Sequence, residues 1–141
     1  REVIALLRAK ECPHQRTTVI LEGSQLALQL HESCGHPVEL DRALGEELSF
    51  AGSSFLTPDK LDKFRYGSKK INIVADATCP RGAGSFAYDD EGVPAQRIPI
   101  IREGLFVGYL SSRETAAHLK RRSGGCMCVQ RRWALCRAGR A

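Results

Sequence analysis

The spacing of apolar residues along the chain predicts four helices. Helix formers with Val3, Leu6 and Leu7 at helical spacing fill the first, and Pro13 follows its end. Ser24 and Ser112 are placed to cap the second and the fourth, because a serine hydroxyl accepts a bond from an unpaired N–H of the first turn. The four predicted helices cover residues 2–11, 24–35, 39–48 and 112–119.

Runs of β-branched and apolar residues predict strands between these helices. Residues 17–21 and 71–75 are two such runs, and a β-hairpin is predicted where residues 97–101 and 105–110 flank a short connection that contains Gly104. Pro99 suggests an unpaired edge at that point of its strand. The order of the elements predicts an α+β fold, a mostly antiparallel sheet with flanking helices.

Two stretches carry turn signals instead of a clear period. Residues 50–66 predict a surface excursion with a helical turn at 58–64. The acidic run Asp89-Asp90-Glu91-Gly92 offers oxygen ligands for a cation, but it lacks the spacing of an EF-hand loop, and we interpret it as a surface turn.

The composition of the 141 residues is that of one globular domain, and no apolar run approaches the length of a membrane span. No signal peptide precedes the first predicted helix, and the chain begins at Arg1. We therefore expect an internal piece of a longer protein that has no membrane partner.

The net charge of +5 is concentrated in one part of the chain. Residues 120–141 hold seven basic residues and no acidic one, so the remainder carries 14 basic against 16 acidic residues. A basic tail can bind phosphate groups, but Trp133 is its only aromatic residue, so a nucleic-acid-binding function ranks last among the hypotheses.

Three of the six cysteines lie in the same tail, at Cys126, Cys128 and Cys136. The paired spacing of a structural zinc site is absent, and Cys126-Met127-Cys128 is too short for a zinc knuckle. The pattern favours a reduced, cytoplasmic chain.

The candidate chemistry lies in His-Glu-Ser-Cys-Gly-His at residues 31–36. In the familiar zinc-protease motif the histidines are four apart on one helix face, with a Glu as base. Here they are five apart, which on a regular helix places them roughly 140° from each other. Gly35 and Pro37 offer a break that would turn His36 back toward His31 and Glu32. The alternative is that these histidines are structural and only make hydrogen bonds.

Two acids follow the second histidine. Glu39 and Asp41 are close enough in sequence to be partners of an imidazole. They are equally placed to be acids of a first helical turn, where they favour a helix N-terminus.

Four motifs in order resemble the TldD/PmbA family, whose members are sometimes called modulators of DNA gyrase. The motifs are His-Glu-Ser-Cys-Gly-His, Asp-Asp-Glu-Gly-Val-Pro-Ala-Gln, Glu-Gly-Leu-Phe-Val-Gly-Tyr-Leu and Ser-Arg-Glu-Thr-Ala. The similarity runs from about residue 3 to about residue 124. It assigns residues 1–119 to part of the TldD/PmbA metallopeptidase region and the TldD/PmbA fold, and 120–141 to a basic, Cys-rich tail that departs from the family pattern.

The resemblance implies a TldD-like zinc metallopeptidase that cleaves peptides or unfolded proteins inside a closed two-subunit shell. It implies that His31 and His36 bind zinc and that Glu32 is the catalytic base. The partner implied is a second copy or a TldE/PmbA-like subunit. The alternative is a non-catalytic interaction module of such an assembly.

The resemblance also implies that the site is incomplete in this chain. The family's third zinc ligand is a Cys near the end of a longer chain, and none of Cys126, Cys128 and Cys136 matches it. We therefore expect weak or absent zinc and little activity from this chain by itself.

Overall fold

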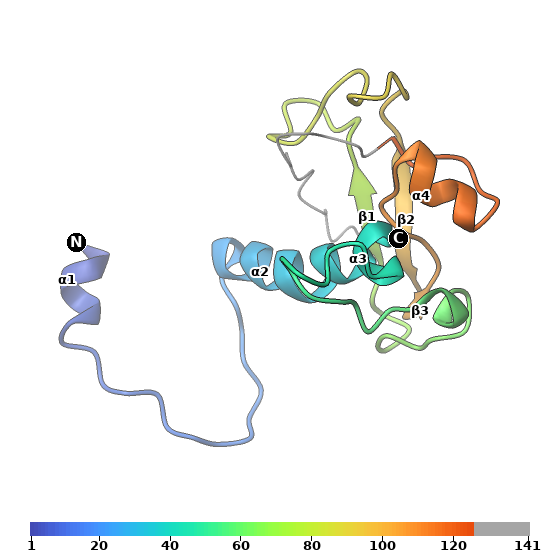
Figure 1. The fold of residues 1–141 in the computed structure, drawn as a ribbon. Helices are drawn as coiled ribbons and strands as arrows, with labels where there is room; N and C mark the ends of the chain where they lie inside the picture. Colours follow the sequence, from blue (N-terminus) through green and yellow to red (C-terminus); the bar gives the residue numbers. More distant parts are fainter. Residues whose placement is uncertain (126–141) are drawn as a thin grey trace.

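The computed structural model describes residues 1–125 and shows a small antiparallel sheet with helices around it (Figure 1). The predicted α+β class is confirmed. The elements in chain order are α1 (Glu2–Leu6), α2 (Gly23–Leu30), η1 (His31–Gly35, a π-helix), η2 (His36–Val38, a 3₁₀-helix), α3 (Leu40–Leu44), η3 (Pro58–Lys60, a 3₁₀-helix), β1 (Ile73–Asp76), β2 (Arg97–Arg102), β3 (Leu105–Phe106) and α4 (Arg113–His118).

The predicted hairpin is present as β2 and β3. Ile101 pairs with Phe106 and Arg102 with Leu105, and both residues of the loop have a positive φ, 46° for Glu103 and 76° for Gly104. That is the backbone that a two-residue hairpin loop needs to match the twist of its strands. A side chain at Gly104 would also meet two backbone carbonyl oxygens at 2.4 Å.

Pro99 lies in the central strand and is paired with β1, so the predicted unpaired edge holds only on the other side, where the β3 ladder reaches no further than Ile101. The strand order is β1-β2-β3, and Pro99 is opposite Val74, beside a register irregularity between Ile73 and Val74. Proline lacks the N–H of a regular ladder, and a bulge is one of the few places inside a sheet that tolerates it.

The core lies between the sheet and the segment that follows the candidate site. Val38, Leu40, Leu56, Ile100, Ile101 and Phe106 are its largest fully buried side chains. A short parallel bridge joins the two parts, because the Leu110 N–H donates to the Val38 carbonyl at 2.8 Å and the Leu40 N–H to the Leu110 carbonyl at 3.0 Å. The end of the candidate site is therefore fixed directly to the core.

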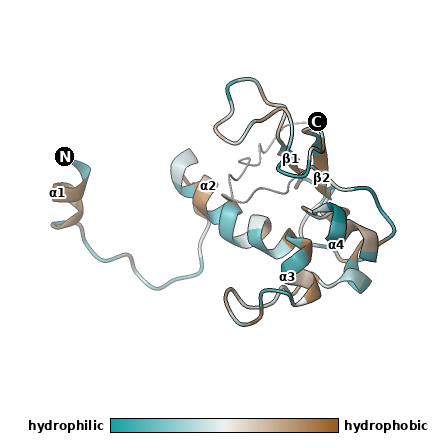
Figure 2. Ribbon diagram, turned by 45° about the horizontal axis from the view of Figure 1, so that its top comes forward, coloured by the Kyte–Doolittle hydropathy of each residue, from teal (hydrophilic) through white to brown (hydrophobic). Residues whose placement is uncertain are grey.

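The N-terminal predictions are only partly correct. The first helix ends at Leu6 instead of residue 11, and residues 17–21 form no strand. Figure 1 shows this part extending away from the sheet, and Ile20 is 99% exposed. A β-branched run becomes a strand only where another strand satisfies its backbone, and the described residues supply none here. Much of α1 is brown in Figure 2, the hydrophobic end of the colour scale, although the helix contains no buried residue.

Residues 50–66 are a surface excursion only in part: Phe50 and Phe55 are exposed, but the segment also enters the core. Leu56 is 0% exposed, and its carbonyl accepts a hydrogen bond from the hydroxyl of Tyr109. The helical turn predicted at 58–64 is shorter and covers Pro58–Lys60. An irregular backbone can still enter a core when side chains and neighbouring strands satisfy its polar groups, which no hydrophobic period reveals.

The remaining elements are shorter or displaced. The helix predicted at 39–48 ends at Leu44, because Gly45 adopts the left-handed conformation (φ 87°) typical of a helix C-terminus. The strand predicted at 71–75 covers Ile73–Asp76. The acidic run is a turn, as predicted, in which Asp89 Oδ1 accepts from the N–H groups of Glu91 and Val93.

The caps of two predicted helices have different outcomes. Ser112 caps α4, as predicted. Its hydroxyl accepts from the Thr115 N–H, and the Thr115 hydroxyl accepts from the Ser112 N–H. Ser24 is not the cap of α2, because Glu22 takes that position and its carboxylate accepts from the Ser24 N–H. The interpretation of the basic tail, with Cys126, Cys128, Trp133 and Cys136, lies outside the described residues.

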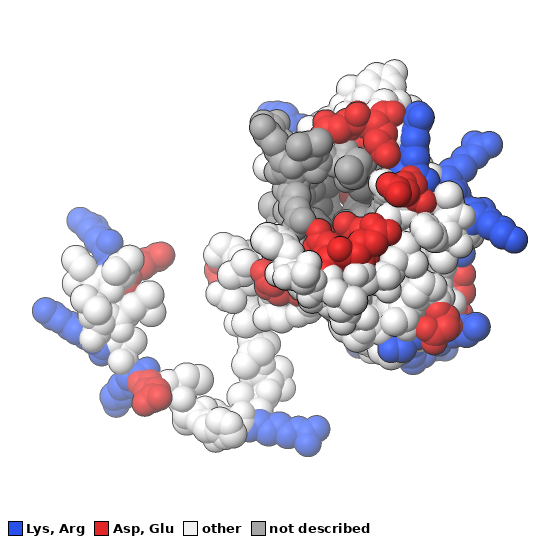
Figure 3. Space-filling model, viewed as in Figure 1, with Lys and Arg blue, Asp and Glu red and all other residues white. Residues whose placement is uncertain are grey.

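Charged side chains are mixed over the face drawn in Figure 3. Acidic side chains gather near α3, and Lys and Arg project from the rim and from the N-terminal segment. No helix among residues 1–125 is both long and apolar enough to span a membrane.

Candidate metal centre

A π-helical turn brings the two histidines of the motif together. The His36 N–H donates to the His31 carbonyl, so the backbone bond spans five residues instead of the four of an α-helix. Residues five apart thereby stack on one face, as residues four apart do in an α-helix. The predicted break at Gly35 is wrong, since His36 keeps helical angles (φ −57°, ψ −42°) and the helix widens instead of ending.

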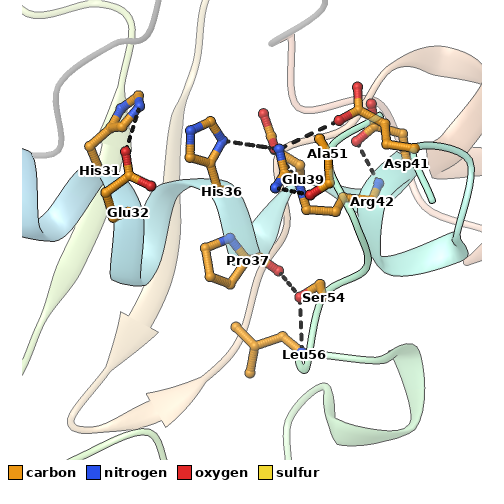
Figure 4. Close-up of polar contacts among 11 residues, drawn as sticks. His31, Glu32, His36, Pro37, Glu39, Asp41, Arg42, Ala51, Ser54 and Leu56 are labelled. Atoms are coloured by element: carbon orange, nitrogen blue, oxygen red, sulfur yellow. Dashed lines mark hydrogen bonds and ion pairs between the residues drawn. The ribbon is translucent and has the colours of Figure 1, made fainter. Parts of the chain in front are cut away.

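His31, Glu32 and His36 form a compact donor group (Figure 4). One ligand atom from each lies within 4.8 Å of the others, and the imidazole centroids are 4.4 Å apart at an interplanar angle of 75°. Glu32 Oε1 lies 3.9 Å from His31 Nε2, and the side chains of His31, Glu32 and His36 are 25%, 61% and 22% exposed. The group is therefore open to a small ion and to water.

The π turn is anchored by Tyr66, which no motif or spacing in the sequence connects with it. Proline at 37 has no N–H to offer the Ser33 carbonyl, which an α-helix would satisfy from that position. The hydroxyl of Tyr66 donates to this carbonyl and accepts from the Cys34 thiol, whose Sγ lies 3.1 Å away. Burial raises the pKa of Cys34 and the pKa of Tyr66, so both groups stay protonated donors.

Ser54 fixes the other side of the turn. Its hydroxyl donates to the Pro37 carbonyl at 2.6 Å and accepts from the Leu56 N–H at 3.0 Å (Figure 4). Ser54 is buried and belongs to the segment that brings Leu56 into the core. The end of the turn is thus held by a residue 17 positions beyond Pro37 in the sequence.

The two acids predicted as partners of an imidazole behave differently. Glu39 Oε2 lies 3.1 Å from His36 Nδ1, whereas Asp41 Oδ1 accepts from the Arg42 N–H at 2.8 Å. Arg42 Nε is 3.0 Å from Glu39 Oε2, an ion-pair contact without the angle of a hydrogen bond. Burial raises the pKa of Glu39, and the hydrogen bond with His36 and the charge of Arg42 oppose that rise.

The donor set fits zinc in kind but falls short in number. Imidazole nitrogens and carboxylate oxygens are ordinary zinc ligands, and a catalytic zinc usually takes three protein ligands. If the carboxylate of Glu32 is left free for proton transfer, His31 and His36 supply only two protein ligands. Cys34 is occupied with Tyr66, and it is the only cysteine in this turn.

The chain matches one protein-family model over most of its length. Residues 14–134 match the model of the PmbA/TldA metallopeptidase C-terminal domain. A paired-histidine turn of this kind is in keeping with a metallopeptidase domain. The chain belongs to the PmbA/TldA metallopeptidase family, and the resemblance drawn from its motifs is confirmed.

Curated relatives of this chain are named as metalloproteases. A metalloprotease of Methanocaldococcus jannaschii is 38% identical over 116 residues, which cover 82% of this chain and 24% of the relative. A metalloprotease of Synechocystis is 34% identical, with 79% of this chain and 23% of the relative aligned. A TldD homologue of Haemophilus influenzae is 31% identical, with 82% of this chain and 22% of the relative aligned. The chain spans about a quarter of the length of these relatives.

Solved structures confirm the fold. TldE from Thermococcus kodakarensis aligns with a TM-score of 0.60 at 21% identity, over 81% of this chain and 24% of that one. A candidate modulator of DNA gyrase from Thermotoga maritima aligns with a TM-score of 0.62 at 22% identity, over 77% and 23%.

The anchoring of the π turn gives a stability prediction. Tyr66→Phe removes the hydroxyl that satisfies the Ser33 carbonyl, and an unsatisfied, partly buried carbonyl should lower the free energy of unfolding by about 1–2 kcal/mol. Urea denaturation measures it, with Tyr88→Phe as the control because Tyr88 is 65% exposed. Equal stability of the two variants would show that the hydroxyl does not anchor the turn.

Proposed function

We propose that this chain carries part of the active site of a TldD-like zinc metallopeptidase that hydrolyses peptides or unfolded proteins. His31 and His36 are the metal ligands and Glu32 is the catalytic base. The observation that carries the proposal is the π turn, because it places residues five apart in the sequence at one point. The family membership and the names of the curated relatives support it.

The chemistry follows from the position of Glu32 beside the two imidazoles. Zinc, when bound there, would supply the positive charge that acidifies a water molecule and polarises the scissile carbonyl. Glu32 is the next residue after a ligand and is mostly exposed, so its carboxylate can reach a water near both histidines. It accepts the proton of that water and then passes it to the leaving amine nitrogen.

The proposal includes an incomplete ligand set. With two protein ligands where a catalytic zinc usually has three, the chain by itself should bind zinc weakly and hydrolyse little. A third ligand from outside these 141 residues, as the family resemblance implies, would complete the site.

A second candidate is a non-catalytic interaction module of a TldD/TldE-type assembly, formed with a second copy or a TldE/PmbA-like subunit. Its support is the apolar surface at the N-terminal end, where neither α1 nor α2 contains a buried residue. Large exposed apolar side chains there include Ile4, Leu7, Ile20 and Leu28. Large apolar side chains left exposed on a helix are available to contact a partner.

Zinc binding tests the ligand assignment. Titrated at high protein concentration, the chain should bind one zinc weakly. His31→Ala or His36→Ala should each raise the dissociation constant by more than the roughly 10–100-fold typical of losing an outer-shell partner. The chain has four histidines, so His14→Ala and His118→Ala are matched controls that should leave the constant unchanged. Equal loss in all four variants, or unchanged affinity in His31→Ala and His36→Ala, would contradict the assignment.

Glu32→Gln separates a base from a ligand. The substitution keeps the shape of the side chain but removes the proton acceptor. Zinc affinity should stay at the wild-type value, and hydrolysis of an unfolded protein should fall by about 10²–10⁴ in a long, zinc-supplemented incubation. A variant as active as the wild type would refute the role of Glu32.

A further inference from the structure

His36 Nδ1 lies between two side chains of opposite charge. Glu39 Oε2, an acceptor, is 3.1 Å away, and Arg42 Nη2, a donor, is 3.3 Å away (Figure 4). A neutral imidazole carries its proton on only one nitrogen. Nδ1 can therefore donate to Glu39 or accept from Arg42, and the two choices fix opposite tautomers.

The contacts favour donation to Glu39. If the proton were on Nε2, the Nδ1 lone pair would face a carboxylate oxygen at 3.1 Å, with little water to screen two acceptors in contact. With the proton on Nδ1, the carboxylate accepts a charge-assisted bond. Arg42 loses little, since Nη1 donates to the Ala51 carbonyl at 3.0 Å and Nη2 lies 3.5 Å from Glu47 Oε2.

The tautomer decides which nitrogen can bind a metal. With Nδ1 protonated, the lone pair is on Nε2, and a metal binds an imidazole through its lone pair. In Figure 4 the ring nitrogen opposite the Glu39 contact is on the side of His31 and Glu32. Donation to Glu39 and direction of Nε2 toward the candidate metal centre are therefore one arrangement.

We propose that Glu39 is a positioning residue: its carboxylate holds His36 with Nδ1 protonated and directs the Nε2 lone pair toward His31 and Glu32. The proposal rests on the proposed function, because it concerns the same site. Arg42 acts through Glu39. Its contacts with Oε2 at 3.0 Å and with the Ala51 carbonyl tie the carboxylate to the turn that follows α3.

The carboxylate of Glu39 has no separate role in capping α3. Glu39 is at the N-cap position, but its side chain makes no capping bond. Glu39→Ala therefore removes the contacts with His36 and Arg42 without removing a helix cap. Asp41→Asn is the matched control, since Asp41 is an acid of the same first turn that contacts a backbone N–H instead of the imidazole.

The test is the tautomer of His36, read from its ring nitrogen shifts by ¹⁵N NMR on the metal-free 141-residue chain. The measurement is made about two pH units above the ordinary pKa of histidine. The wild type and Asp41→Asn should show protonated Nδ1, and Glu39→Ala should shift the population toward protonated Nε2. A wild-type ring protonated at Nε2 would overturn the proposal even if Glu39→Ala fails to fold, and so would an unchanged tautomer in a folded Glu39→Ala variant.

Zinc affinity gives the second readout. Glu39→Ala should raise the dissociation constant about 10–100-fold, the usual effect of losing the partner of a ligating histidine, and Asp41→Asn should leave it unchanged. If His31→Ala and His36→Ala leave zinc affinity unchanged, the proposed function fails, while the tautomer of the metal-free chain still decides the role of Glu39. Wild-type zinc affinity in Glu39→Ala would overturn the positioning role alone.

Discussion

The hydrogen bond from the His36 N–H to the His31 carbonyl is the constraint on which the candidate site depends. Moving this bond from the fourth residue to the fifth widens one turn of helix, and only then do the two imidazoles share a face. Such turns are rare because the backbone packs less well, and they occur often at functional sites. Pro37 favours the change, since it cannot supply the N–H that would continue a regular α-helix past Ser33.

The surroundings of the turn show how its backbone groups are satisfied. The Tyr66 hydroxyl donates a hydrogen bond to the Ser33 carbonyl, and the Ser54 hydroxyl donates one to the Pro37 carbonyl. The parallel bridge from Val38 and Leu40 to Leu110 then connects the end of the turn to the buried sheet. Each of these bonds prevents the cost of an unpaired polar group near the core. The site is thus preorganised by contacts from three separate parts of the chain.

Local signals in the sequence predicted the local structure. The hairpin around Gly104, the cap at Ser112 and the turn at Asp89 depend on residues within a few positions of one another, and all three are present. The strand at 17–21 failed because a strand needs a partner, which β-branched residues do not supply. Leu56 was misplaced because tertiary contacts bury it without any hydrophobic period.

In the candidate site, too, the sequence predicted the local features but not those that depend on distant segments. The residue types and their order identified His31, Glu32 and His36, and Glu39 followed from its nearness in sequence to His36. The geometry that joins them did not follow, since a five-residue spacing on a regular helix separates the histidines. Tyr66 and Ser54 come from distant segments, and no spacing rule connects them to the motif.

X-ray absorption at the zinc edge of the zinc-loaded chain shows whether both histidines bind one ion, because it counts the ligands of that ion. If the π turn presents both histidines to one ion, the spectrum should show two imidazoles with nitrogen at about 2.0–2.1 Å and no sulfur. A first shell with sulfur at about 2.3 Å, or with fewer than two imidazoles, would place the ion on cysteines or elsewhere and contradict the account.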